Sequence, residues 1–249
     1  MLNWTLVGWV VIGLAVILLA LLSWGVRIKM PSLRKTDFVR RYKASQAISM
    51  EQGKDQQVVL GNRLVSRAYP GLGLTALSAM PLLITPETLT DGNQSIASAA
   101  GSLAVLARQV IEGRYANGFS EQLSHSRVEA SVYGVTPFSF TAGLLPELEF
   151  ASLGNLLYLG DYGPESGLAV KKAADRGAQV FAAAGSLTAQ ATLFLCVQDL
   201  LLGEEVFMLA PSLAGSQQSR TALVVEDLLR VALIVLLVTG AVLKMCGVL

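Results

Sequence analysis

Apolar and polar positions alternate in a regular rhythm between residues 56 and 214. Short apolar runs, most of which end in a glycine, are followed by longer segments in which apolar residues recur every three or four positions. Continuous short apolar runs are typical of strands that are buried on both faces, and the longer segments have helical spacing. The predicted strands lie at 57–61, 94–98, 128–134, 155–160, 178–185 and 198–203.

The segments between these strands predict helices, so the chain reads as successive strand–helix units. The predicted helices lie at 64–80, 99–114, 137–150, 164–176, 186–196 and 204–213. Alternation of strands with helices indicates a parallel sheet. We therefore expect an α/β fold with a parallel, Rossmann-like sheet of five or six strands. Residues 81–93 and 115–127 are less regular and are expected to be loops, the first with room for a short strand.

Residues 155–185 are the clearest of these units. Gly160 and Gly163 suit a tight corner between a strand and a helix, and Pro164 suits a first helical turn, where its missing N–H costs nothing. Gly177 is placed for a left-handed cap at the end of the helix. These features account for the corner without a ligand.

The apolar excess is concentrated at the two ends of the chain. The whole sequence is 53% hydrophobic and only 15% charged, against about 25% charged in soluble domains. Residues 2–25 and 226–248 are each long enough, at about 1.5 Å per residue, to cross a hydrocarbon core of about 30 Å as a transmembrane helix. A cleaved signal peptide is the alternative for the first segment, but no Lys or Arg precedes it and no small-residue cleavage site follows it.

A basic juxtamembrane segment at 26–45 sets the expected orientation. Its basic residues are Arg27, Lys29, Arg34, Lys35, Arg40, Arg41 and Lys43, against the single acidic residue Asp37. Such an excess is retained on the cytoplasmic side. We expect an inner-membrane protein with two spans, both termini outside, and a cytoplasmic α/β domain at 46–220.

The same basic residues are expected to contact membrane lipids. Residues 44–220 carry ten basic and fifteen acidic side chains, whereas nucleic-acid binders need a basic face on the folded domain. Each basic residue near an anionic lipid surface contributes about 1 kcal/mol. Lipid contact is therefore favoured over nucleic acid.

Candidate ligand-binding residues follow from the fold, because open parallel sheets bind ligands beyond the carboxyl ends of their strands. The candidates are Gly160, Asp161, Gly185, Ser186, Gly203 and Glu204. Backbone N–H groups at such corners hold anions, which points to a nucleotide or a small anionic metabolite. Capping and turn chemistry alone is the alternative explanation for the same residues.

No established catalytic motif is present. "GLGLTA" at 71–76 has the spacing of a dinucleotide-binding loop, but Tyr69-Pro70 precedes it in place of a strand. The phosphate-binding GxxxxGK[ST] and the serine-hydrolase GxSxG are absent. His125 is the only histidine, and Cys196 and Cys246 lack metal-ligand spacing. We predict no cofactor and no His- or Cys-based metal site, and leave carboxylate coordination open.

The C-terminal part resembles an uncharacterised family of bacterial membrane proteins that carries a domain of unknown function. The resemblance rests on "LLLGEEVFMLAPSLAG" at 200–215 and "EDLLRVALIVLLVTGAVLKMCGVL" at 226–249. In that family a strand-Gly-Glu-Glu-helix unit leads through a short linker into a closing membrane helix. The resemblance implies the architecture and no catalytic residues.

Three functions remain compatible with these patterns. The first is a non-catalytic scaffold that self-associates or joins a larger membrane complex, favoured by the two anchors and by small-residue segments at 97–104 and 182–185. The second is a sensor or enzyme that binds at the strand ends. The third is a channel or transporter, which is disfavoured because neither span carries an ionisable residue at mid-membrane.

Overall fold

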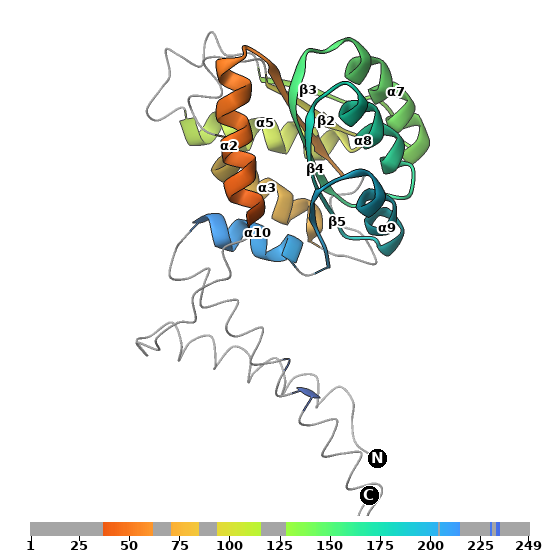
Figure 1. Cartoon of the computed structure of the whole chain (residues 1–249). Coiled ribbons are helices and arrows are strands. Elements are labelled where there is room, and N and C mark those ends of the chain that lie inside the picture. The colour runs from red at the N-terminus through yellow and green to blue at the C-terminus, as the bar shows by residue number, and fades with distance from the viewer. Residues whose placement is uncertain are drawn as a thin grey trace, which may run out of the picture. The chain divides into compact units, whose positions relative to one another are not determined.

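A single parallel sheet of six strands organises the chain. The computed structural model describes residues 37–61, 71–84, 94–115, 128–203 and 205–214, together with 230, 233 and 234. The strands are β1 (Asp55–Leu60), β2 (Gln94–Ser98), β3 (Val128–Ser131), β4 (Leu153–Gly160), β5 (Gln179–Ala184) and β6 (Asp199–Leu201). Their order is β3-β2-β1-β4-β5-β6, and every neighbouring pair is parallel (Figure 1). The predicted parallel α/β sheet is confirmed, and its order is the one found in doubly wound dinucleotide-binding folds.

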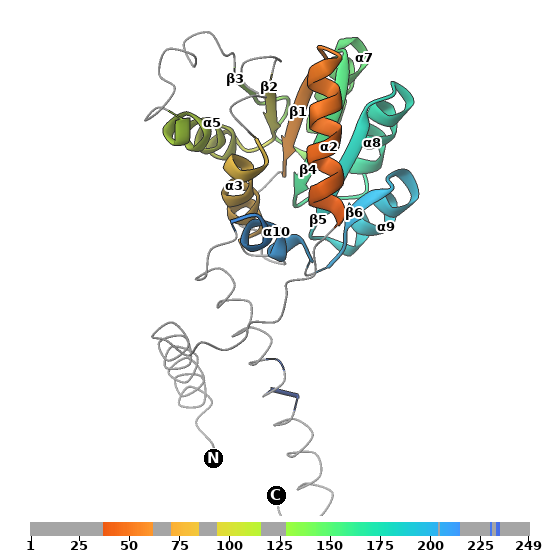
Figure 2. The same ribbon diagram turned by 60° about the vertical axis from the view of Figure 1, so that its left-hand side comes forward.

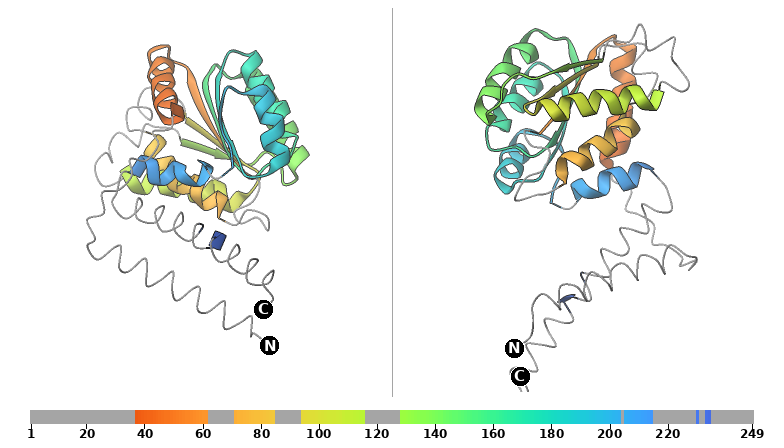
Figure 3. Two further views of the ribbon diagram at one scale, coloured as in Figure 1. Left: turned by 60° about the horizontal axis from the view of Figure 1, so that its bottom comes forward. Right: turned by 180° about the vertical axis from the view of Figure 1, so that it is seen from behind.

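Helices cover both faces of the sheet. One layer contains α2 (Asp37–Glu51), α3 (Leu72–Leu83), α5 (Gly101–Tyr115) and α10 (Glu205–Ala214). The other contains α7 (Pro137–Phe150), α8 (Ser166–Asp175) and α9 (Leu187–Cys196) (Figures 2 and 3). The sheet grows from β1 toward β3 and from β4 toward β6 in opposite directions. Right-handed crossovers therefore place α3 and α5 on one face and α8 and α9 on the other.

The core is split by the sheet into two apolar layers. Val58 and Leu157 pack with the layer that includes α2 and α3, while their neighbours Val59 and Leu156 pack with the layer that includes α7 and α8. Successive side chains of a strand point to opposite faces, so a strand covered on both sides needs an unbroken apolar run. All eight residues of β4 are buried, as this requirement predicts.

Helix α2 belongs to the compact unit that contains the sheet, which runs from Thr36 to Leu213. The predicted boundary between the basic segment at 26–45 and the α/β domain at 46–220 falls inside this helix. At its start, the rings of Phe38 and Tyr42 pack edge-on against Phe181 of β5, with centroid distances of 5.6 and 5.1 Å. The next inward positions of α2 are polar, so no apolar helical pattern marks it in the sequence.

The polar half of α2 lies on a row of amide side chains. Gln94, Gln56, Asn155 and Gln179 are aligned in register across four adjacent strands, near the amino ends of the strands. Gln46 of α2 donates to Gln56 Oε1 at 3.1 Å, and the Nε2 of Gln94 donates to the same oxygen at 3.2 Å. Ser45 lies against the next two members of the row, Asn155 and Gln179. Because buried polar groups are favoured where they are paired, the bonds from Ser45 and Gln46 to this row favour one placement of α2 on the sheet.

An ion pair fixes α2 to the far edge of the sheet. Arg41 Nε lies 2.6 Å from Asp199 Oδ1 at the start of β6, and the Asp199 side chain is only 6% exposed. Arg40 pairs instead with Asp37 on the same helix, where both side chains are exposed, and Lys43 is exposed. Arg41 therefore points toward the sheet, although it was predicted to contact membrane lipids with the other basic residues.

Several element boundaries differ from those predicted. Helix α3 continues through Pro81 to Leu83, where a loop was expected. Strands β3 and β6 are shorter than their apolar runs, and α8 begins at Ser166 after a turn at Pro164 and Glu165. Gly177 has a φ of 84°, which confirms the predicted left-handed cap.

The predicted transmembrane segments at 2–25 and 226–248 lie outside the described residues, apart from Arg230, Leu233 and Ile234, whose side chains are exposed. Arg27, Lys29, Arg34 and Lys35 also lie outside them. Among the residues that are described, no helix is both long and apolar enough to cross a bilayer.

Removing the charge of Arg41 tests the ion pair that fixes α2. The Arg41→Gln variant leaves the Asp199 carboxylate buried without its partner, and we expect the free energy of unfolding to fall by about 1–3 kcal/mol. Urea unfolding of the full chain in mild detergent measures the change. Lys43→Gln is the matched control and should stay within about 0.5 kcal/mol of the wild type. Adding Asp199→Asn to Arg41→Gln should recover part of the loss; equal stability of Arg41→Gln and the wild type would contradict the assignment.

Candidate functional site

The two central strands end in direct backbone contact. Gly61, which follows β1, donates its N–H to the carbonyl oxygen of Leu159 in β4 at 2.9 Å. A Cβ on Gly61 would lie 2.3 Å from the backbone nitrogen of Asp161, and one on Gly160 would lie 2.3 Å from that of Gly61. Gly160 also has a φ of 144°, which residues with a side chain rarely adopt. Both positions require glycine, and the space between the two strand ends is closed.

Tyr162 fills the region behind this contact. Its side chain is 4% exposed, and its hydroxyl lies 2.8 Å from the carbonyl oxygen of Val59 and 3.1 Å from that of Leu159. The ring of Tyr158 stacks beside it, with a centroid distance of 4.1 Å. Burial raises the pKa of both hydroxyl groups well above the usual value for tyrosine, so both stay neutral. Tyr162 thereby ties the turn after β4 to the end of β1.

The remaining polar groups of this corner bond to one another. The N–H of Gly163 donates to Glu165 Oε1 at 2.8 Å, which explains why Glu165 is buried. Ser186 donates to the carbonyl oxygen of Tyr162 at 2.5 Å and accepts from the N–H of Ala189 at 3.1 Å, so it caps α9. The N–H of Gly185 donates to the carbonyl oxygen of Gly160 at 3.3 Å.

Four of the six predicted ligand-binding residues therefore meet at one corner: Gly160, Asp161, Gly185 and Ser186. The carboxylate of Asp161 is half-buried and forms no hydrogen bond or ion pair within the described part of the chain. Gly203 lies apart, after β6, with a φ of 59°, and Glu204 lies outside the described residues. The bonds at this corner favour the structural explanation of its glycines and serine over a ligand-gripping role.

A cavity of about 220 Å³ opens at the opposite, amino edge of the sheet. Its lining consists of Asp55, Gln94, Ser95, Glu129, Glu147, Ala151 and Leu153. Glu129, Ser95 and Gln57 are neighbours in one row across β3, β2 and β1. Glu147 of α7 lies against this row, since Gln57 and Ser95 both interact with its carboxyl group. Sequence reasoning missed the cavity because it looked for ligands only at the carboxyl edge.

Burial raises the pKa of Glu147 above its ordinary value, and the negative charge of Glu129 acts in the same direction. Gln57 and Ser95, which lie beside the carboxyl group, partly counteract the shift because their polar groups favour its charged form. Gln57 is 1% exposed, and neither of its amide atoms has a partner in good hydrogen-bond geometry. Carboxyl groups whose pKa is shifted by burial and a neighbouring charge are found both at functional sites and in structural networks.

A second cavity, of about 400 Å³, lies between the amino ends of β5 and β6 and the ends of α8 and α9. Gln179, Gln198, Asp199 and the free thiol of Cys196 contribute its polar atoms. Asp199 is already paired with Arg41. Among the described residues, no three potential metal-ligating side chains come close enough to hold a metal ion. His125 and Cys246 lie outside those residues.

Comparison with known proteins gives no functional assignment. No family model matches the sequence, and no curated protein matches it. One solved structure that aligns with the chain is the trehalose-6-phosphate phosphatase N-terminal domain of Candida albicans, at 15% identity and a TM-score of 0.29. The alignment covers 81% of this chain and 49% of that one, so the chain spans about half of its length. A TM-score this low supports neither a shared fold nor a shared activity.

Substituting Gly160 tests the backbone contact at the centre of the sheet. Gly160→Ala introduces both an unfavourable φ and a clash with Gly61, and we expect it to lower the free energy of unfolding by more than about 3 kcal/mol. Two glycines with open space around them serve as controls. Gly177→Ala adds only the strain of a positive φ and should cost about 1–2 kcal/mol, whereas Gly113→Ala inside α5 should stabilise by about 0.5–1 kcal/mol. Equal losses at Gly160 and Gly177 in denaturant unfolding of the full chain would show that the contact is unimportant.

Proposed function

We propose that this protein is a non-catalytic, self-assembling scaffold, anchored in the cytoplasmic membrane with its α/β domain in the cytoplasm. The anchoring rests on the long apolar segments at 2–25 and 226–248 and on the basic residues beside the first of them. Self-assembly rests on one observation above all, the exposed apolar surface of α9. The corner at the carboxyl edge adds support, because the N–H groups of Gly163 and Gly185 and the hydroxyl of Ser186 bond within the fold.

The α9 surface consists of Leu187, Ala191, Phe194 and Leu195. Leu187, Phe194 and Leu195 are 75%, 65% and 84% exposed, while Ala189 and Leu193 face the core. The helix contains no Asp, Glu, Lys, Arg or His. Exposed large apolar side chains that gather on one uncharged helix favour a contact with another protein surface.

The charged residues beside the α9 surface favour a second copy of the chain as its partner. Next to α9, the charged residues of α8 are paired: Lys171 with Asp175, and Lys172 and Arg176 with Glu149 of α7. A two-fold interface places one surface against itself, so it tolerates a neutral apolar patch whose bordering charges are paired. An anionic lipid surface would instead favour unpaired cations, whereas all three of these cations are in ion pairs.

The second candidate function is binding of a nucleotide or a small anionic metabolite at the carboxyl edge. The strand order favours it, because β1 and β4 form the switch point where doubly wound sheets bind ligands. The unpaired carboxylate of Asp161 is the group most available there. A negative charge at this position disfavours an anion unless it binds a sugar hydroxyl or a cation beside it.

Charged substitutions on α9 test self-assembly. We expect the wild-type full chain in mild detergent to form a dimer or larger oligomer, and the Phe194→Asp/Leu195→Asp variant to associate roughly tenfold or more weakly. Size-exclusion chromatography with light scattering over a range of concentrations measures the change. Val105→Asp, at a 56% exposed position on α5, is the control and should keep the wild-type oligomeric state. A monomeric wild-type protein, or equal behaviour of the two variants, would contradict the proposal.

Protease accessibility tests the membrane topology. In spheroplasts, protease added from outside should leave the compact unit of residues 36–213 intact, whereas the same treatment of inverted membrane vesicles should degrade it. A known periplasmic protein in the same preparation reports on the integrity of the membrane. Digestion in intact spheroplasts, or recovery of the full chain in the soluble fraction, would exclude the proposed arrangement.

A further inference from the structure

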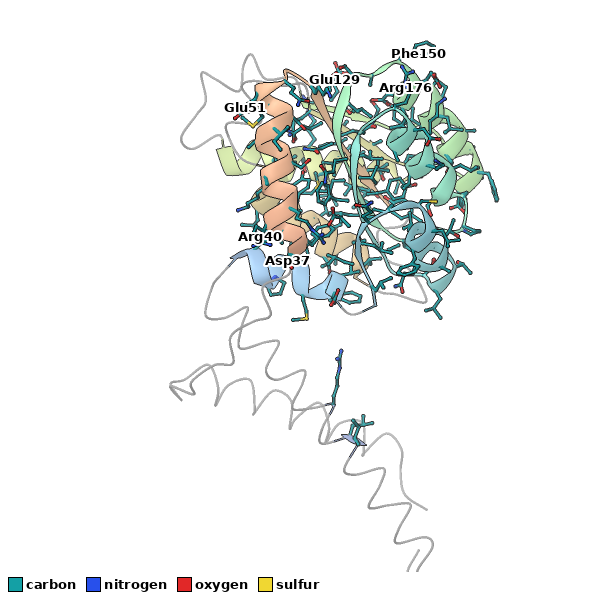
Figure 4. All side chains as sticks on the ribbon, viewed as in Figure 1. Asp37, Arg40, Glu51, Glu129, Phe150 and Arg176 are labelled. Atoms are coloured by element: carbon teal, nitrogen blue, oxygen red, sulfur yellow. The ribbon has the colours of Figure 1, made fainter. Side chains whose placement is uncertain are left out.

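The start of α2 and the helix α10 lie at the same end of the domain. The compact unit of residues 36–213 begins with α2 and finishes with α10. In Figure 4, Asp37 and Arg40 lie beside α10, whereas Glu51 and Glu129 lie at the opposite end. Glu51 precedes β1 and Glu129 lies in β3 near its start, so these two residues mark the amino edge of the sheet. Both connections to the rest of the chain therefore leave the unit at the carboxyl edge.

Helices α3 and α10 present an apolar surface at this end of the domain. They lie side by side in the layer that also contains α2 and α5 (Figures 2 and 3). Helix α3 contains no charged residue, and Glu205 is the only charged residue of α10. Leu74 is 52% exposed, and Leu82, Phe207 and Met208 are partly exposed; these four residues define the α3–α10 surface. Apolar side chains that reach the surface of two neighbouring helices almost without charge favour contact with an apolar partner.

The length of the two connections favours the membrane as that partner. Eleven residues, 26–36, separate the predicted span at 2–25 from α2, and eleven more, 215–225, separate α10 from the predicted span at 226–248. Even fully extended, eleven residues reach only about 35–40 Å. A compact unit of this size is itself about 40 Å across. With both predicted spans in the bilayer, the carboxyl edge is therefore the end that lies near the lipid, because the amino edge would reach it only with both connections fully stretched.

The charges of the two connections favour an anionic lipid surface over a second copy of the chain. The connections carry five basic residues and no acidic residue. The basic residues are Arg27, Lys29, Arg34, Lys35 and Arg220. Each contributes about 1 kcal/mol near an anionic lipid surface. A two-fold contact through the α3–α10 surface would instead bring the like charges of two copies together, which disfavours it.

We propose that the α3–α10 surface lies on the cytoplasmic leaflet of the membrane, with Leu74 and Met208 at the boundary between the headgroups and the acyl chains. The proposal rests on the membrane anchoring proposed above and adds an orientation to it. The carboxyl edge of the sheet faces the lipid, and the amino edge with Glu51 and Glu129 faces away from it. The strand ends where doubly wound sheets bind ligands are then turned toward the headgroups. The α9 surface takes no part in this contact, so lipid docking and self-assembly use different surfaces.

Quenching by spin-labelled lipid tests this orientation in the full chain. The background carries Cys196→Ser and Cys246→Ser, and a fluorophore is attached at Leu74→Cys, Met208→Cys or Ile48→Cys. The protein is reconstituted in vesicles of phosphatidylcholine and phosphatidylglycerol that contain a lipid with a nitroxide near its headgroup. Apolar helix faces enter this region by about 5–10 Å, so we expect quenching at Leu74→Cys and Met208→Cys to be at least about twofold stronger than at Ile48→Cys.

Ile48 is the matched control, because it is apolar and 53% exposed but lies one turn from Glu51, at the amino-edge end of α2. A charge on the docking surface provides a second measurement. Met208→Asp should reduce the quenching at Leu74→Cys, while the protein still floats with the vesicles because the predicted spans anchor it. If Met208→Asp fails to fold, Leu74→Asp with the fluorophore at Met208→Cys replaces it, since Leu74 is the more exposed position.

Three outcomes would overturn lipid docking alone: floating protein with equal quenching at all three positions, stronger quenching at Ile48→Cys, or no effect of the introduced aspartate. Shielding of the Leu74→Cys and Met208→Cys fluorophores from aqueous iodide without quenching by the lipid would indicate a protein partner, and would also refute the proposal. Protein that does not float with the vesicles would refute the anchoring and the docking together. The oligomeric state, measured in parallel, separates these results from that of the self-assembly test.

Discussion

The fold depends on one backbone contact, between Gly61 and Gly160 at the ends of β1 and β4. These two strands begin the two halves of the sheet, and after them the chain must turn to opposite faces. That divergence normally opens a crevice at this point. Here the backbones touch where a Cβ on either residue would clash, and the hydroxyl of Tyr162 reaches the carbonyl oxygens of both strands. Backbone geometry therefore fixes the distance between the two strand ends at the centre of the sheet, from which the chain turns to the helices on either face.

The contact between Gly61 and Gly160 closes the place where a doubly wound sheet usually binds its ligand. In an open doubly wound sheet, free N–H groups and capping side chains at the carboxyl edge hold the ligand. In this chain the equivalent groups of Gly163, Gly185 and Ser186 bond within the corner. At the amino edge, buried polar atoms of Gln57 and Glu147 lack a partner in good hydrogen-bond geometry, and burial raises the pKa of Glu147. The fold type alone therefore does not say which edge of the sheet carries a function, which has to be argued from the site.

The sequence predicts the strands and most helices well because each buried strand must be continuously apolar. Residues 94–98 and 137–150 agree with the observed elements at both ends. Helix α2 escapes prediction because its buried positions include Ser45, Gln46 and Ser49, so the signal that marks an amphipathic helix is missing. The amino-edge cavity escapes for a different reason. Its acidic residues come from three separate segments, and only the strand order and the placement of α7 bring them together.

The structure shows a second role for part of the basic segment near residue 40. Counted along the chain, each of its seven cationic residues adds to the attraction of an anionic membrane, at about 1 kcal/mol apiece. Arg41, however, faces the sheet and neutralises Asp199, and Arg40 shares its charge with Asp37. Among the described members of the segment, only Lys43 is both exposed and outside an ion pair with a described residue. Part of the charge that the sequence predicts for lipid contact therefore stabilises the packing of α2 on the sheet.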